Sequence, residues 1–278
     1  MDTGFSPFDP NGSGPDDDGS RGPRLRDISI RMMIPNIITA LAIGAGLTGI
    51  RLAFEQRFEL AVSMVLLAAF LDAVDGRVAR LLKPTTKFGA QMDSLADIVN
   101  FGVAPALVLY AYLLDQVRSF GWIAAMIYAI AAALRLARFN VMEDRETKAT
   151  WQSDYFLGIP APGGAMLVLL PVYLGFLGVE GSALFAYLAS AYTLLIALLL
   201  VSRVPVYSGK TLGQRIRRDL VFPIMLIVVL YVALLMTFTW ETMTATTVLY
   251  LLSLPFGARA WGRRYGAESE VGESENSD

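Results

Sequence analysis

Long runs of apolar residues are the feature that most constrains how this chain can fold. Apolar side chains make up 55% of its 278 residues and charged ones only 17%. A helix needs about 20 consecutive apolar residues to cross a bilayer, where every backbone polar group must be paired inside the protein. Eight such runs occur, at residues 33–53, 59–82, 91–113, 120–138, 161–179, 182–202, 220–240 and 243–259. The sequence therefore predicts an all-α fold, a polytopic membrane helix bundle of about eight transmembrane helices.

The two ends of the chain have a different composition. Residues 1–27 are rich in Gly, Pro, Ser and charged side chains, and the C-terminal end is acidic. Such segments contain too little apolar surface to bury a core. We expect a disordered cytoplasmic tail at 1–27, a transmembrane domain at 28–262 and a disordered acidic cytoplasmic tail at 263–278. The first tail lacks the apolar stretch of a signal peptide, so we expect it to be retained.

The distribution of Lys and Arg predicts the orientation in the membrane. When the connections between the eight runs are assigned alternately to two sides, 20 of the 23 Lys and Arg residues fall on the side of the N-terminus. Only Arg51, Arg57 and Arg118 fall on the other side. Because positive charge concentrates in cytoplasmic loops, both termini are predicted to be cytoplasmic. The expected location is the cell (inner) membrane.

Four aspartates stand in an otherwise apolar region, at the ends of the second and third runs. Asp72 and Asp75 are three residues apart, and Asp93 and Asp97 are four apart. On a helix, such pairs share one face. Four converging carboxylates repel one another and are costly to desolvate, and their hard oxygen atoms suit Mg²⁺ or Mn²⁺. The spacing predicts a site for two such ions, although the aspartates could also be interfacial charges that cap membrane helices.

The chain contains no cysteine and no histidine. It therefore has no thiol nucleophile and lacks the commonest general base. A carboxylate is the natural proton acceptor that remains. Pro35, Asn36 and Thr39, near the start of the first run, are consistent with an N-terminal helix motif or, less directly, with side chains that face the acidic site.

The acidic segment resembles the signature of the CDP-alcohol phosphatidyltransferases, Asp-x-x-Asp-Gly-x-x-Ala-Arg-(x8)-Gly-x-x-x-Asp-x-x-x-Asp. The eight fixed positions of that pattern are Asp72, Asp75, Gly76, Ala79, Arg80, Gly89, Asp93 and Asp97. The resemblance implies that the aspartates bind the metal ions and that Asp97 acts as general base. It also implies that Gly76, Ala79, Arg80 and Gly89 bind CDP-diacylglycerol, although both glycines could serve packing alone and Arg80 could be an interfacial charge.

Three further segments resemble the branch of this family that uses serine as acceptor. They are residues 93–106, 134–140 and 155–162, and Asn100 stands in the first where that branch usually has Ser. Arg135 and Arg138 lie three residues apart at the end of the fourth run. A guanidinium group fits the carboxylate of serine well, so we expect Arg135 and Arg138 in the acceptor site. We also expect Asn100 there, because it stands in the first of the three segments. Membrane anchoring by the two arginines is an equally good interpretation.

The resemblance implies metal-dependent transfer of a phosphatidyl group from CDP-diacylglycerol to L-serine, in a homodimer surrounded by membrane lipids and without nucleic acid. Glycerol phosphate, inositol phosphate or choline are the alternative acceptors. A membrane prenyltransferase and a cation transporter are more distant alternatives. Direct attack by the acceptor hydroxyl is favoured, and a covalent phosphatidyl-aspartate route remains open.

Overall fold

The computed structural model describes residues 30–82, 87–143, 155–202, 205–207 and 218–254. The two predicted tails and the boundaries of the predicted domain lie outside these residues. In chain order the elements are α1 (Ile30–Phe54), α2 (Phe58–Leu82), α3 (Lys87–Asp97), η2 (Ile98–Val103), α4 (Ala104–Tyr112), η3 (Leu114–Val117), α5 (Arg118–Glu143), β1 (Tyr155–Leu157), α6 (Ala161–Val168), α7 (Leu170–Phe176), α8 (Ala183–Val201), β2 (Pro205–Tyr207) and α9 (Arg218–Thr237). A further helix covers residues 239–254.

The all-α prediction is confirmed, because most described residues of each of the eight apolar runs are helical. Five helical segments of the described chain are long and apolar enough to cross a membrane: Met33–Phe54, Phe88–Tyr112, Leu114–Val141, Ala183–Val201 and Leu220–Thr237. The protein is thus an integral membrane protein by the length and composition of its helices. The helix α2 is of similar length but carries the charged motif, and the run at 161–179 is divided into α6 and α7 at Leu169.

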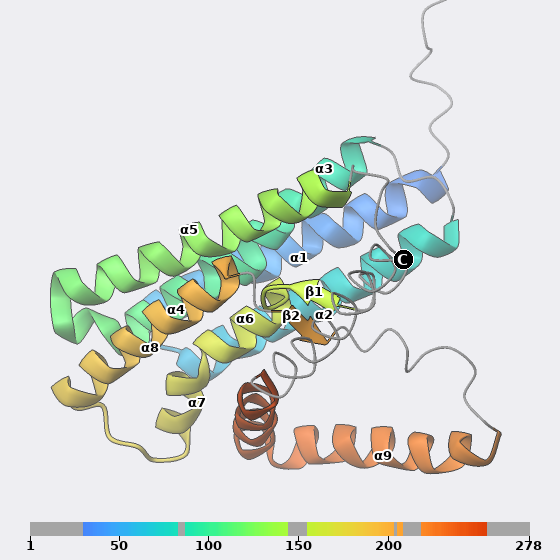
Figure 1. The fold of residues 1–278 in the computed structure, drawn as a ribbon. Coiled ribbons are helices and arrows are strands. Elements are labelled where there is room, and N and C mark those ends of the chain that lie inside the picture. Colours follow the sequence, from blue (N-terminus) through green and yellow to red (C-terminus); the bar gives the residue numbers. More distant parts are fainter. Residues whose placement is uncertain (1–29, 83–86, 144–154, 203–204, 208–217, 255–278) are drawn as a thin grey trace, which may run out of the picture.

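The helices α1, α3, α4, α5 and α8 run alongside one another in a bundle (Figure 1). Its core consists of small and branched apolar side chains, with the buried rings of Tyr128 and Tyr173 among them. The helix α9 lies apart from this bundle, and none of the residues in its membrane-length segment is buried. The two short strands, which the sequence did not predict, pair antiparallel with Tyr155 opposite Tyr207.

A wide π-helical turn, η2, follows Asp97 directly and joins α3 to α4. The normal helical pairing of backbone groups is interrupted in such a turn, which is often found at functional sites. Here the hydroxyl of Tyr128 in α5 donates a hydrogen bond of 2.9 Å to the carbonyl oxygen of Phe101. The π turn therefore gains support from α5 immediately beyond the last aspartate of the motif.

An aromatic cluster lies at one end of the bundle. The ring of Phe58 at the start of α2 meets Tyr112 at the end of α4, with centroids 4.9 Å apart. Tyr112 contacts Phe176 at the end of α7 at 5.6 Å, and Phe176 contacts Trp240 at 4.5 Å. Edge-to-face contacts of this kind add to the stability gained from burial. Since α2 starts in this cluster, its aspartates lie toward the opposite end of the bundle.

Candidate active site

Three of the four motif aspartates converge from two helices. Asp72 and Asp75 come from α2 and Asp93 from α3, and one carboxylate oxygen of each lies within 4.8 Å of the others. The three-residue spacing on α2 places its pair on one face, as the sequence predicted. Asp75 is buried, whereas Asp93 is exposed. The cluster thus reaches from the packed interior to an accessible surface.

Thr39 of α1 holds the buried member of this cluster. Its hydroxyl lies 2.7 Å from Oδ2 of Asp75 and 3.0 Å from the carbonyl oxygen of Pro35. Both Thr39 and Asp75 are almost fully buried. This hydrogen bond fixes the orientation of the Asp75 carboxylate, so α1 also contributes to the site. The sequence favoured a helix-start motif for Thr39 over a position facing the acidic site, and it could not predict the contact with Asp75, 36 residues away.

The carboxylates fit a divalent cation. Oδ1 of Asp72 and Oδ1 of Asp75 are buried and have no hydrogen-bond partner among the described residues. Buried carboxylate oxygens of this kind normally require a partner that carries positive charge. Hard oxygen donors such as these carboxylates are the ligands that Mg²⁺ and Mn²⁺ prefer.

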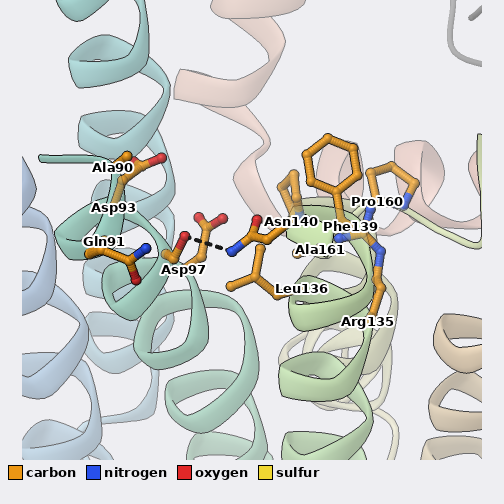
Figure 2. Close-up of a pocket in the computed structure, with 12 residues that line it drawn as sticks. Ala90, Gln91, Asp93, Asp97, Arg135, Leu136, Phe139, Asn140, Pro160 and Ala161 are labelled. Carbon is orange, nitrogen blue, oxygen red and sulfur yellow. Dashed lines mark hydrogen bonds between the residues drawn. The ribbon is translucent and has the colours of Figure 1, made fainter. Parts of the chain in front are cut away.

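Asp97 stands beside the cluster and faces a cavity. Its carboxyl group lies close to that of Asp72. It also lines a cavity of about 420 Å³ together with Asp93. The other walls come from α3, α5 and the start of α6, and the lining residues are Ala90, Gln91, Ser94, Arg135, Leu136, Phe139, Asn140, Pro160, Ala161 and Pro162 (Figure 2). Asp97 therefore connects the acidic cluster to a space large enough for a small polar molecule.

The two candidate arginines of α5 have different surroundings. Arg135 lines the cavity, its charge attracts that of Asp97, and its Nε atom is buried without a hydrogen-bond partner in the described part of the chain. Arg138 is exposed, and its Nη1 donates a hydrogen bond of 2.7 Å to the carbonyl oxygen of Val201 at the end of α8. The structure thus brings Arg135 into the cavity, and Arg138 into contact with α8.

The residues expected to bind the nucleotide lie along α2 and at the start of α3. A Cβ atom added to Gly76 would meet nothing within 4 Å, so there is open space beside this glycine. Arg80 is exposed, and its Nε donates to the carbonyl oxygen of Gly76 at 3.0 Å. Gly89 is half-buried, and Ala79 lies in the helical backbone of α2. The space beside Gly76 would admit a phosphate or sugar group.

Asn100, which was expected in the acceptor site, does not line the cavity. Its side chain is fully buried in η2, and neither Oδ1 nor Nδ2 has a partner among the described residues. It packs instead against Gly46 of α1, where an added Cβ would collide with Oδ1 of Asn100. Two polar residues of the cavity, Ser94 and Asn140, lie in the segments that resemble the serine branch, but the sequence predicted no role for them.

Comparisons with known proteins identify the family to which this chain is similar. Residues 32–202 match a family described as CDP-alcohol phosphatidyltransferase, and residues 219–255 match one described as CDP-alcohol phosphatidyltransferase 2. A protein of Mycobacterium leprae named CDP-diacylglycerol–serine O-phosphatidyltransferase is 36% identical over 239 residues, which cover 84% of this chain and 77% of that protein.

Two further relatives carry the same name. That of Helicobacter pylori is 32% identical over 231 residues, covering 82% of this chain and 91% of the relative. That of Mycobacterium tuberculosis is 41% identical over 189 residues, covering 67% of this chain. The match spans 63% of the length of that relative.

Proposed function

Because the chain belongs to the CDP-alcohol phosphatidyltransferase family, we propose that it transfers a phosphatidyl group from CDP-diacylglycerol to L-serine, giving phosphatidylserine and CMP. The observation that carries this proposal is a single cavity that has Asp97 beside the acidic cluster and Arg135 in its wall. The names of the three relatives support serine as the acceptor. Family membership also argues against the prenyltransferase and the cation transporter.

The aspartates of the cluster would hold the divalent cations that the family requires. Asp72, Asp75 and Asp93 would be the main metal ligands, because their oxygens lie together. Asp97 lies close enough to Asp72 to contribute a further oxygen. When bound, such ions neutralise the pyrophosphate and stabilise the charge that develops during transfer. Gly76, Ala79, Arg80 and Gly89 would bind the nucleotide part of the donor. Of these, Arg80 can direct its guanidinium group onto phosphate oxygens.

Asp97 is the general base in this proposal. Its carboxylate accepts the proton of the serine hydroxyl, and the hydroxyl oxygen forms a bond to the phosphorus that carries diacylglycerol. The bond from this phosphorus to the phosphate oxygen of CMP breaks, and CMP leaves with the bonding electrons. Arg135 binds the carboxylate of serine, because a guanidinium fork matches a carboxylate and its Nε has no partner in the described structure.

The orientation and assembly follow from the sequence pattern and the resemblance. Both termini and the acidic cluster would face the cytoplasm, where serine and nucleotide-activated lipids are available, since 20 of 23 Lys and Arg residues fall on that side. A homodimer in the cell membrane is expected from the family resemblance.

The test is transfer by the purified full-length protein. It would be incubated with CDP-diacylglycerol, Mg²⁺ or Mn²⁺, and labelled serine, glycerol phosphate, inositol phosphate, choline or ethanolamine. We expect phosphatidylserine and an equal amount of CMP with serine, no product after EDTA, and recovery on adding metal. Product with another acceptor and none with serine would overturn the serine assignment and leave phosphatidyl transfer standing.

A second measurement distinguishes direct transfer from a covalent route. Direct transfer requires both substrates at once, so labelled CMP should not exchange into CDP-diacylglycerol when serine and phosphatidylserine are absent. Rapid exchange under those conditions would require a phosphatidyl-enzyme, with an aspartate as nucleophile.

A further inference from the structure

A hydrogen bond joins the two helices that form the sides of the cavity. Nδ2 of Asn140 in α5 donates to Oγ of Ser94 in α3 at 3.0 Å. Both residues line the cavity, and Figure 2 draws this bond with Asp97 close to it in the view. Ser94 precedes Asp97 by three residues, so the two share a face of α3. The pair Asn140–Ser94 therefore belongs to the polar wall that also contains Asp97.

The direction of this hydrogen bond determines what the wall can offer a ligand. Since the amide nitrogen of Asn140 points to Ser94, its Oδ1 is an acceptor with free lone pairs. Within the described residues, the Asn140 side chain makes its hydrogen bond through Nδ2, to Ser94. Together with the Asp97 carboxylate, this wall presents acceptor oxygens, whereas Arg135 presents a positive charge.

A cavity with these two kinds of groups fits a zwitterion better than an anion. An ammonium group brings three N–H donors and a positive charge, which match oxygen acceptors beside a carboxylate. A phosphorylated acceptor would bring the negative charge of its phosphate group to the same wall, which already contains Asp97. The polar wall thus favours an acceptor that has an ammonium group, and Arg135 favours one that also has a carboxylate.

We propose that Oδ1 of Asn140, oriented by Ser94, accepts a hydrogen bond from the ammonium group of the acceptor and so selects an amino acid over other alcohols. This inference rests on the proposed serine transfer and deepens it. Asn140 contacts the substrate in this arrangement, and Ser94 is a positioning residue. The carboxylate, ammonium and hydroxyl groups of serine are then recognised by Arg135, Asn140 and Asp97, respectively.

The test compares two acceptors that differ in the ammonium group alone. L-Serine and 3-hydroxypropanoate share the hydroxyl and the carboxylate, and the second lacks the ammonium. Asn140→Ala should lower kcat/KM for serine about 10- to 100-fold, through KM, because a hydrogen bond to a charged group is lost. The same variant should change the interaction with 3-hydroxypropanoate less than about twofold, measured as a substrate or as a competitive inhibitor of serine. The KM for CDP-diacylglycerol should stay unchanged.

Further variants distinguish a role of Asn140 in binding the acceptor from a purely structural role. Asn140→Asp keeps an acceptor oxygen and should retain far more activity with serine than Asn140→Ala. Ser94→Ala should produce a smaller rise in the KM for serine, because it only releases the Asn140 side chain. Gln116→Ala removes an exposed amide from η3, outside the cavity, and should behave as wild type.

Equal losses with serine and 3-hydroxypropanoate would overturn the inference, because they would make Asn140 a structural residue only. Failure of the proposed function gives a different result, in which the wild-type protein transfers phosphatidyl groups to another acceptor and not to serine.

Discussion

Among the four motif aspartates, Asp97 lines the cavity without belonging to the cluster of three carboxylates, whereas Asp93 does both. Asp72, Asp75 and Asp93 place oxygens within 4.8 Å of one another, while Asp97 lies beside this group and lines the cavity together with Arg135. A residue that accepts a proton from the acceptor is needed for turnover and not for donor binding. This arrangement favours a division of roles among four chemically identical side chains.

The corresponding variants should therefore lose different steps. Asp72→Asn and Asp93→Asn should lose metal binding and with it tight binding of CDP-diacylglycerol. Asp97→Asn should lower kcat about 10²- to 10⁴-fold and still bind CDP-diacylglycerol. Binding would be measured in the presence of Mg²⁺ and turnover by CMP release, with Asp115→Asn in η3 as a control outside the site. Near-complete loss of donor binding in all three variants would make Asp97 chiefly a metal ligand.

Thr39 offers a test of how α1 supports the cluster. Thr39→Val keeps the shape of the side chain and removes the donor that lies 2.7 Å from Asp75 Oδ2. Loss of such a supporting contact should weaken Mg²⁺ or Mn²⁺ binding about 10- to 100-fold. Thr48→Val is the matched control, because Thr48 is on the same helix and its hydroxyl donates to the carbonyl oxygen of Gly44, with no other bond within the described parts of the chain. Equal metal affinity in the two variants would exclude this role for Thr39.

At the scale of elements, α1 and the π turn η2 pack closely against each other beside the site. Gly46→Ala would drive a methyl group into Oδ1 of Asn100, whereas an added Cβ on Gly44 meets nothing within 4 Å. We expect Gly46→Ala to lower the free energy of unfolding by about 1–3 kcal/mol, as overpacking usually does. Gly44→Ala should have little effect in the same thermal unfolding series in detergent.

A second substitution should restore the lost stability if this contact is the cause. Asn100→Ser shortens the side chain that Gly46→Ala meets, so the double variant should recover much of the difference. An additive result for the two substitutions would show that the clash is relieved elsewhere.

The sequence could predict those elements that depend on local pattern. The apolar runs gave the helices, and spacings of three and four residues gave the pairs Asp72–Asp75 and Asp93–Asp97. It could not predict relations between distant elements. Thr39 and Asp75 meet only because α1 packs along α2, and Asn140 and Ser94 meet only because α3 and α5 flank one cavity.

For the same reason, the sequence could not predict the different surroundings of the two arginines or the positions of the irregular elements. Arg135 and Arg138 are equivalent in sequence, and only the position of α8 distinguishes them, since Arg138 bonds to Val201. The π turn η2 has no residue pattern that distinguishes it from an ordinary helix. It is supported by the hydrogen bond from Tyr128 of α5, which is distant in sequence. The short strands pair across 50 residues and carried no local signal.

At the scale of the whole molecule, the bundle has two distinct ends. The aromatic cluster around Tyr112 marks one, and the last turns of α2 mark the other. With 25 residues, α2 is about 37 Å long, enough to connect the two faces of a membrane. The predicted orientation places the acidic end in the cytoplasm.

Single cysteines can test this orientation, because the chain contains no cysteine of its own. Gln116→Cys lies in η3 at the aromatic end, and Leu81→Cys lies in the last turn of α2. A maleimide that cannot cross membranes should label the first variant in intact cells and the second only after permeabilisation. The reverse pattern would place the active site on the outer face.

The depth of the carboxylates has a consequence for how the rate depends on the surrounding lipid. Asp75 lies seven residues before the end of α2, which is about 10 Å along a helix, and the predicted orientation places this end at the cytoplasmic face. The lipid donor therefore reaches the site by diffusion in the two dimensions of the bilayer. Serine reaches it by diffusion in three dimensions through the water. The rate then follows the mole fraction of CDP-diacylglycerol in the bilayer and the molar concentration of serine in water. Inert phospholipid added to a vesicle slows the reaction without changing the amount of either substrate.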